Sequence, residues 1–200
     1  MCNLYSEKVS YRQLFDEFSQ LKLPLLFPPP AAAPNLEPLE EVRPTDLAPV
    51  IRSRGHGVEL VALKWGFAPS APKRPPVINF RSEGRRFGAG RCLVPASAFY
   101  EFTGSSYPKT RWRFTTPGHD WFCFAGLSRP AHDGWPESFT LLTCAPGPDV
   151  QPYHDRQPVV VPRPLWAAWL DPQADPAPIL QPSPAGALAV EPAPRQKPLL

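Results

Sequence analysis

The second residue of the chain is a cysteine, and this position allows chemistry that an internal cysteine lacks. Cysteine is small enough for the initiator Met1 to be removed, which leaves Cys2 with a free α-amine and a thiol on adjacent carbons. The amine can condense with an aldehyde to an imine, and the thiol can then close on the same carbon as a thiazolidine. An α-amine titrates near pH ~8, so part of it is unprotonated at neutral pH. The alternative is that Cys2 is simply an encoded residue at a frayed terminus.

A carboxylate and a histidine stand in contexts that suit proton transfer. Glu101 lies within an aromatic run, residues 98–102 (AFYEF), whose rings would desolvate the carboxylate and raise its pKa toward that of a general acid. The alternatives are a strand glutamate that faces water or pairs with an arginine. His154 lies in 153–158 (YHDRQP), just before an apolar segment, where a histidine can also be only a loop cap. Asp155 and Arg156 could pair with the backbone or with each other and fix that loop.

The basic residues are unevenly distributed along the chain. The net charge is +3, but seven basic residues oppose Glu83 alone over residues 64–91, which gives +6 there and −3 elsewhere. The seven are Lys64, Lys73, Arg74, Arg81, Arg85, Arg86 and Arg91. Such asymmetry indicates a polyanionic partner, although a solvated loop with scattered charge is an equal alternative.

The composition indicates one globular domain. The chain has 200 residues, 42% of them hydrophobic, despite 31 prolines. No start-of-chain apolar run or membrane-length segment is present, which favours a cytosolic or nuclear protein. The four cysteines are far apart and form no CxxC pair, so we expect thiols and no metal site. Cys123 and Cys144 lie in apolar runs and should be buried.

The elements that must position these residues follow from periodicity. Apolar residues at helical spacing predict a helix over 10–22, where Ser10 and Gln13 have the form of a capping box and Pro24 ends the helix. Residues 24–49 are predicted to be an irregular connection. Strands are predicted at 58–65, 111–115, 121–127, 139–144 and 159–161, and a short helix at 164–170. The sum is an α+β single domain with a largely antiparallel sheet.

Six segments, in this order, resemble the SOS response-associated peptidase (SRAP) family, whose members shield abasic sites in DNA. They are residues 1–2 (MC), 65–69 (WGFAP), 79–83 (NFRSE), 91–96 (RCLVPA), 99–101 (FYE) and 154–158 (HDRQP). The resemblance covers about 1–171 and leaves 172–200 as a Pro-rich segment that packs on the domain or is partly frayed. It implies a largely antiparallel, barrel-like β-sheet with a few peripheral helices, in a monomer.

The resemblance also implies roles for the chemical groups. Cys2, exposed after loss of Met1, would attack the ring-opened sugar aldehyde of an abasic site and form a thiazolidine crosslink. Asn79 would orient the Cys2 amine or the sugar. Glu101 would protonate the leaving oxygen and help to release Met1, and His154 would shuttle a proton. No metal or cofactor is implied, and the protein would be cytoplasmic and associated with nucleoid DNA.

The expected partner is single-stranded DNA that contains abasic sites. A basic groove with aromatic stacking platforms is how single strands are bound. The residues expected in this groove are Arg81, which would hold a phosphate, and Lys64, Lys73, Arg74, Arg85 and Arg86. Trp65 or Phe102 would stack on a base, with core packing as the alternative for both.

The chain departs from the family pattern at Phe80, Phe102, Gln157 and Asn3-Leu4, which leaves the details of DNA contact open. Two rival functions remain. The first is a thiol peptidase acting in trans through Cys2 and His154. The second is a non-catalytic module that binds single-stranded DNA and in which Cys2 is incidental.

Overall fold

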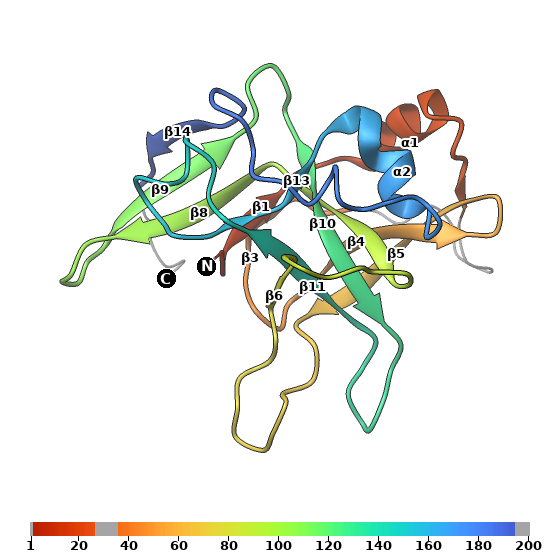
Figure 1. The fold of residues 1–200 in the computed structure, drawn as a ribbon, viewed down its shortest axis with the longest axis horizontal. Helices are drawn as coiled ribbons and strands as arrows, with labels where there is room; N and C mark the ends of the chain where they lie inside the picture. Colours follow the sequence, from red (N-terminus) through yellow and green to blue (C-terminus); the bar gives the residue numbers. More distant parts are fainter. Residues whose placement is uncertain (1, 27–35, 195–200) are drawn as a thin grey trace.

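A computed structural model describes residues 2–26 and 36–194 as two β-sheets with two short α-helices (Figure 1). One sheet has five strands, in the order β14-β9-β8-β1-β3, and the other has nine, including the path β12-β11-β10-β7-β4-β5-β2. The strands are β1 (Tyr5–Glu7), β2 (Leu25–Leu26), β3 (Leu39–Val42), β4 (Leu47–Arg54), β5 (Gly57–Trp65), β6 (Asn79–Arg81), β7 (Arg91–Ala96), β8 (Ala98–Thr103), β9 (Thr110–Thr115), β10 (Phe122–Arg129), β11 (Ser138–Cys144), β12 (Gln157–Pro158), β13 (Val160–Val161) and β14 (Ala189–Pro192).

The larger sheet is partly ring-like. The end of β5 pairs in parallel with the start of β11, through Ser138 opposite Lys64 and Phe139 opposite Trp65. This pairing joins the two ends of the series β11-β10-β7-β4-β5. The predicted α+β domain with a largely antiparallel sheet is therefore confirmed, and its barrel-like character takes the form of this ring.

Alternate residues of the ring strands pack toward opposite sides, as the period of two in a strand requires. On one side, residues such as Leu60 and Leu93 pack in one hydrophobic cluster with Phe18 of α1 and Trp169 of α2. On the other side, residues such as Leu63 and Phe124 pack with residues of the five-stranded sheet, among them Tyr5, Phe99 and Phe114. The ring therefore lies between the helices and the smaller sheet, and the second cluster contains Cys2.

The two predicted helices are present and shorter than expected. The first, α1 (Tyr11–Gln20), begins with the predicted capping box: Ser10 Oγ accepts from Gln13 N and Gln13 Oε1 accepts from Ser10 N. It ends before Lys22, whose φ of 57° is not helical. The second divides into a 3₁₀ turn, η1 (Arg163–Leu165), and α2 (Trp166–Leu170). No helix in the described ranges has the length and apolar character that crossing a membrane requires.

The prediction of an irregular connection over 24–49 was wrong in part. Within the described ranges, β2, β3 and the start of β4 fall in this segment. The predicted strands 58–65, 111–115, 121–127, 139–144 and 159–161 correspond to β5, β9, β10, β11 and β13. Strands β1, β6, β7, β8 and β12 were not predicted. Cys123 and Cys144 are buried thiols, as expected.

Candidate active site

Cys2 lies three residues before the start of β1, in the hydrophobic cluster between the two sheets. Its side chain is fully buried, and its thiol donates to the Leu4 carbonyl at 3.5 Å. Leu4 O also accepts a bond from Tyr100 N at 3.1 Å, which ties the start of the chain to β8. Burial, and to a lesser extent the nearby Glu101 carboxylate, hold the pKa of the Cys2 thiol far above its ordinary value. The sulfur is therefore a neutral thiol that needs a base before it can attack.

Asn79 holds the backbone of Cys2 from the other sheet. It begins β6, which pairs in parallel with β11 through Leu141 opposite Asn79. Asn79 Nδ2 donates to the Cys2 carbonyl oxygen at 2.7 Å. Asn79 Oδ1 is buried and accepts no hydrogen bond from any group in residues 2–26 and 36–194. One end of this amide thus fixes Cys2, and the other is a buried acceptor beside it.

Glu101 lies on β8, beside the terminal segment, and its side chain is 4% exposed. Burial, with a smaller contribution from the negative charge of Asp155, raises the pKa of Glu101 from 4.5 to about 7. A carboxyl group with this pKa can both donate and accept a proton near neutral pH. The sequence-based expectation of a desolvated carboxylate therefore agrees with the environment of Glu101.

His154 reaches the same place from the connection between β11 and β12. Its Nε2 lies 3.9 Å from Glu101 Oε2. Burial is the main cause that lowers the pKa of His154 below 6.5, so the ring is neutral at pH 7. Its Nδ1 faces the Arg156 main-chain N–H at 3.0 Å and Asp155 Oδ1 at 2.8 Å. The neutral ring satisfies the first contact by accepting at Nδ1, which leaves the Nε2 hydrogen directed to Glu101. The second contact requires a hydrogen on Nδ1, so it cannot form together with the first.

The loop that carries His154 is fixed by neighbours on both sides. Tyr153 packs against Trp112 with ring centroids 4.7 Å apart, and Trp112 is the β9 partner of Glu101. On the other side, the buried Gln157 accepts from Gly147 N at 2.6 Å and donates to Ser183 Oγ at 3.0 Å. Gln157 is one of the departures from the family pattern, and here it joins the loop to the C-terminal segment.

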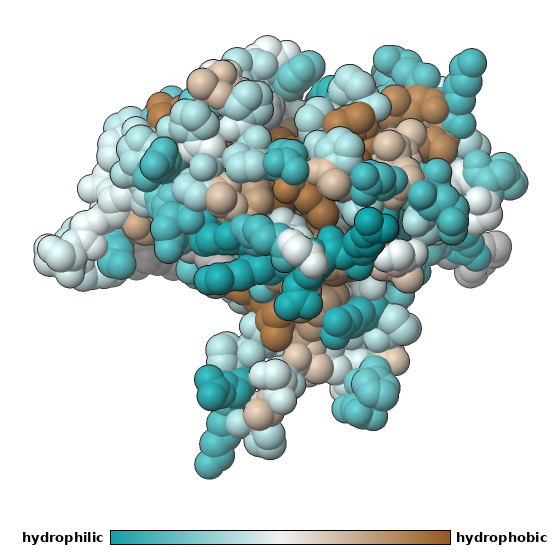
Figure 2. Space-filling model, in the orientation of Figure 1, coloured by the Kyte–Doolittle hydropathy of each residue, from teal (hydrophilic) through white to brown (hydrophobic). Residues whose placement is uncertain are grey.

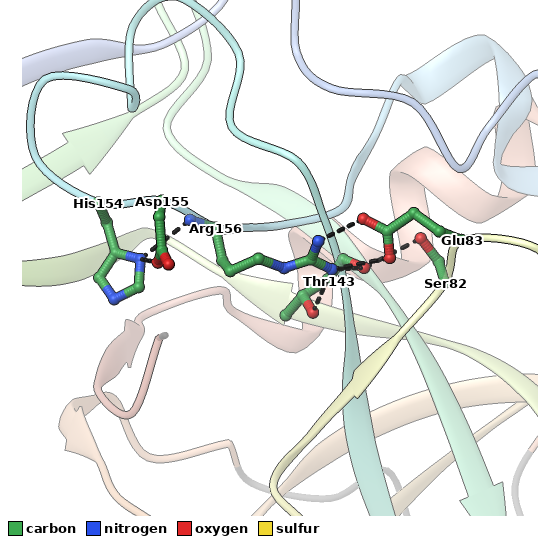
Figure 3. Close-up of polar contacts among 6 residues, drawn as sticks. All are labelled: Ser82, Glu83, Thr143, His154, Asp155 and Arg156. Atoms are coloured by element: carbon green, nitrogen blue, oxygen red, sulfur yellow. Dashed lines mark hydrogen bonds and ion pairs between the residues drawn. The ribbon is translucent and has the colours of Figure 1, made fainter.

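Arg156 connects the two polar motifs that contain Asn79 and His154 (Figure 3). Its guanidinium forms a two-pronged ion pair with Glu83, in which Nη2 lies 2.9 Å from Oε2. Nη2 also donates to Thr143 O at 2.9 Å, and Ser82 Oγ donates to the same carbonyl at 2.9 Å. This pair was not predicted from the sequence. From the sequence, Arg156 was expected to pair locally with the backbone or Asp155, and Glu83 only to oppose the basic charges.

Five of the predicted DNA-binding residues are exposed: Arg81, Lys73, Arg74, Arg85 and Arg86. Lys73 and Arg74 lie in the connection between β5 and β6, which extends away from the ring (Figure 1). Lys64 is half-buried, with Nζ 4.3 Å from the centroid of the Trp135 ring. Arg91, which contributed to the charge asymmetry, is buried and donates to the carbonyls of Asp171 and Ala174, so it has a structural role.

The two predicted stacking residues differ in their surroundings. Trp65 is fully buried, stacks on Phe139 at 6.3 Å and donates to Ile78 O at 3.0 Å. The core-packing alternative therefore describes Trp65, and its face is closed to a base. Phe102 is half-buried and lines a hollow of about 420 Å³. The other residues of this hollow are Asn3, Leu4, Glu41, Arg43, Pro44, Tyr107 and Arg111.

The site as a whole brings together a buried thiol, an amide, a carboxyl group with a pKa of about 7 and a neutral imidazole. Glu101 belongs to the smaller sheet and Asn79 to the larger one, whereas Cys2 lies in the segment that leads into β1 and His154 in a loop. Within residues 2–26 and 36–194, nowhere do three or more His, Cys, Asp or Glu side chains form a cluster that could hold a metal ion. The groups present suit nucleophilic attack and proton transfer.

Comparison with known proteins places these residues in a family context. The family model described as SOS response associated peptidase (SRAP) matches residues 1–196. The abasic site processing protein YoaM of Bacillus subtilis is 27% identical over 189 residues, which cover 86% of this chain and 80% of that protein. The abasic site processing protein YobE of the same organism is 28% identical over 157 residues, 68% of this chain and 69% of that protein.

Solved structures share the fold. A protein from Bordetella bronchiseptica superposes with a TM-score of 0.75 at 22% identity, covering 97% of this chain and all of the other. A phage-related protein from the same organism gives a TM-score of 0.72 at 23% identity, with 97% and 95% of the two chains covered. At these sequence identities, the similarity to the two structures shows a shared fold and nothing about function.

Proposed function

Because the chain belongs to the SOS response-associated peptidase family, we propose that it processes abasic sites in single-stranded DNA by capturing them covalently through Cys2. The observation that carries this proposal is the convergence on Cys2 of residues from three distant motifs. Asn79 bonds the Cys2 carbonyl, Glu101 acts electrostatically on the Cys2 thiol, and His154 faces Glu101. The names of the relatives YoaM and YobE, both abasic site processing proteins, support the choice of substrate.

The reaction begins when hydrolysis of the bond between Met1 and Cys2 frees the Cys2 α-amine. This amine attacks the aldehyde carbon of a ring-opened abasic sugar and forms a carbinolamine. Loss of the carbinolamine hydroxyl as water gives an iminium ion. The Cys2 sulfur then bonds to the same carbon and closes the thiazolidine. One water molecule leaves for each adduct, and neither an oxidant nor a cofactor is consumed.

Glu101 supplies both proton transfers in this sequence. In its acid form it protonates the departing hydroxyl, and the resulting carboxylate accepts the proton of the Cys2 thiol as the sulfur attacks. Glu101 therefore ends the cycle protonated, as it began. A pKa of about 7 suits a group that works in both directions near neutral pH. The buried thiol, whose own pKa is raised, depends on such a base.

Asn79 and His154 prepare the groups that react. Asn79 holds the Cys2 backbone through Nδ2, and its buried Oδ1 provides an acceptor for a hydrogen of the freed α-amine. That contact would direct the amine lone pair toward the sugar. His154, neutral and directed at Glu101 through Nε2, moves a proton between Glu101 and the opening sugar.

The DNA is held by basic residues, five of them exposed and Lys64 half-buried. Arg81 lies two residues after Asn79 on β6, so both side chains extend from the same face of this strand. Figure 2 shows hydrophilic residues across the middle of the face that carries β6 and β11. Arg81 holds a phosphate next to the abasic sugar, Phe102 offers a ring to a neighbouring base, and Lys64, Lys73, Arg74, Arg85 and Arg86 extend the positive track.

The proposal is tested by the state of the Cys2 thiol in the adduct. Mature protein, with loss of Met1 confirmed by mass, is incubated with an abasic-site oligonucleotide, denatured and treated with iodoacetamide. A thiazolidine consumes the thiol, so alkylation is expected at Cys92, Cys123 and Cys144 but not at Cys2. An adduct in which Cys2 is alkylated would be an imine only and would contradict the ring closure.

A further inference from the structure

Five exposed arginines in residues 2–26 and 36–194 form no ion pair with a carboxylate, and three of the five lie around one hollow; the five are Arg74, Arg81, Arg85, Arg86 and Arg129. Eight arginines form ion pairs with carboxylates. Arg85, Arg86 and Arg129 are exposed, and no carboxylate in residues 2–26 and 36–194 lies within ion-pair distance of them. The closest acidic residue in sequence, Glu83, is engaged by Arg156. These three positive charges are therefore available to an external anion.

The three arginines line one hollow of about 620 Å³, together with Phe80, Phe87 and residues 88–90. No acidic residue contributes to its wall. Like charges around a shared space repel one another, and a bound anion removes this cost. The hollow was not anticipated as a unit, because Arg129 lies outside the basic window of the sequence.

Aromatic rings orient two of the guanidinium groups. The guanidinium carbon of Arg85 lies 4.7 Å from the centroid of Phe80, and that of Arg129 lies 4.3 Å from the centroid of Phe67. Stacking covers the flat face of a guanidinium and leaves the N–H groups at its edge able to donate. Two N–H groups in one plane match a phosphate in a bidentate manner.

The loop that carries Arg85 and Arg86 is anchored at its far end. Phe87 is 9% exposed and packs on Phe80 at 6.3 Å. Ser128 N donates to Gly90 O at 2.7 Å, so the loop is tied to the residue beside Arg129. Gly90 has φ of 73°, and a Cβ there would lie 2.5 Å from Ser128 O. The two segments that carry the three arginines are thus held side by side by the fold before any ligand arrives.

The hollow lies close to Cys2 along the chain but on the other face of β6, because Phe80, which lines it, extends from the face opposite to that of Asn79 and Arg81. From Asn79, which contacts Cys2, the chain runs through Arg81 to Arg85. Six residues span at most about 22 Å. One strand of a duplex has a phosphate about every 3.4 Å along the axis, so this reach corresponds to about six nucleotides.

We propose that this hollow binds backbone phosphates of the DNA flank on one side of the abasic site, through Arg85, Arg86 and Arg129. The inference rests on the proposed function, since it takes the DNA to be seated at Cys2. It adds Arg129 to the contact surface and limits the contact to one flank, within about six nucleotides of the captured sugar.

The test measures reversible binding to an oligonucleotide with a tetrahydrofuran abasic analogue, which has no aldehyde and cannot crosslink. The variant is Arg85→Gln/Arg86→Gln/Arg129→Gln. Lys8→Gln/Arg12→Gln/Lys22→Gln is the matched control, because it removes the same charge beside α1, away from β6 (Figure 1). Loss of three phosphate contacts is expected to reduce the slope of log K against log salt by about 2 for a single strand. The control is expected to keep the slope of the unaltered protein.

Trimming the flanks tests the location. With flanks of about ten nucleotides on both sides, the variant should show the reduced slope; with one particular flank cut to about two, variant and unaltered protein should agree. An unchanged slope in the variant, or a deficit that persists when either flank is trimmed, would overturn the inference. Failure of the proposed function would be recognised by a different result: the unaltered protein would form no adduct with a natural abasic site.

Discussion

The side-chain amide of Asn79 donates a 2.7 Å hydrogen bond to the main-chain carbonyl of Cys2, a residue 77 positions earlier. Chain termini are usually poorly ordered unless they are tied down. This bond and the contacts of Leu4 with β8 tie the N-terminus between the two sheets. A terminal aminothiol held in this way has a fixed position relative to Glu101, which is what an amine and a thiol that act in turn require.

Replacing Glu101 by Gln should slow adduct formation by ~10²-fold at saturating DNA, the usual scale for loss of a general acid. The substitution keeps the shape of the side chain but cannot move protons. Single-turnover rates on an abasic oligonucleotide measure the effect, and the exposed Glu191→Gln serves as control. Equal rates for Glu101→Gln and the unaltered protein would remove Glu101 from the chemistry.

The rate of adduct formation should have a bell-shaped dependence on pH. The Cys2 amine must be unprotonated, with a pKa near ~8, whereas Glu101 must be protonated, with a pKa of about 7. The product of the two fractions is greatest between these values and falls on either side. In Glu101→Gln the fall at high pH should disappear. A fall at high pH that survives in this variant would assign that limb to another group.

A second buried carboxyl group makes a prediction about stability. Glu7 on β1 is 1% exposed, and burial raises its pKa from 4.5 to about 7, against one hydrogen bond from Val9 N at 2.7 Å. The folded state therefore binds a proton that the unfolded state has released between these pH values, and stability falls as pH rises from about 4.5 to about 7.

Glu7→Gln should remove this loss, because Gln keeps the acceptor for Val9 N and carries no charge. The variant should gain up to about 3 kcal/mol relative to the unaltered protein at pH 8 and nothing at pH 4. Urea unfolding at the two pH values measures this difference. An equal effect at both pH values would show that Glu7 does not titrate as its burial requires.

Arg156→Lys tests whether the pair with Glu83 positions the site. Lysine keeps the charge but cannot bond both carboxylate oxygens and Thr143 O in one plane. We expect adduct formation at saturating DNA to slow by ~10- to 100-fold, the scale of a displacement of about 1 Å. Arg113→Lys, which alters an exposed pair with Glu191, is the control. An unchanged rate for Arg156→Lys would show that the pair of Arg156 and Glu83 contributes to the stability of the fold and not to adduct formation.

The sequence predicted those parts of the fold that local patterns determine. The capping box of Ser10 and Gln13 located α1, and β-branched or aromatic runs located β5, β9, β10 and β11. It missed β4 and β7 because each contains a proline, Pro49 and Pro95, which argues against a strand. Both strands tolerate proline because β4 and β7 pair with each other only through residues 51–52 and 92–93. At Pro49 and Pro95, one side of the strand therefore has no partner between β4 and β7, so the missing N–H of proline leaves no ladder hydrogen bond unmade there.

The candidate site likewise has residues that the sequence predicted and contacts that it did not. Cys2, Asn79, Glu101 and His154 were predicted by residue type and family resemblance, and the structure brings them together. The Arg156–Glu83 pair joins residues 73 positions apart, and no local pattern indicates such a contact. Likewise, the sequence left Trp65 between base stacking and core packing and placed Arg91 only within the basic window, whereas tertiary packing buries both.

The most direct test of covalent capture uses a single-stranded oligonucleotide with one natural abasic site and a denaturing gel. Protein with Met1 removed, as confirmed by mass, should give a band shifted by the mass of the adduct. Cys2→Ala should bind the same oligonucleotide reversibly and give no shifted band. A denaturation-stable adduct formed by Cys2→Ala, or reversible binding without any adduct by the mature protein, would contradict the account; the second result would indicate a plain DNA-binding module.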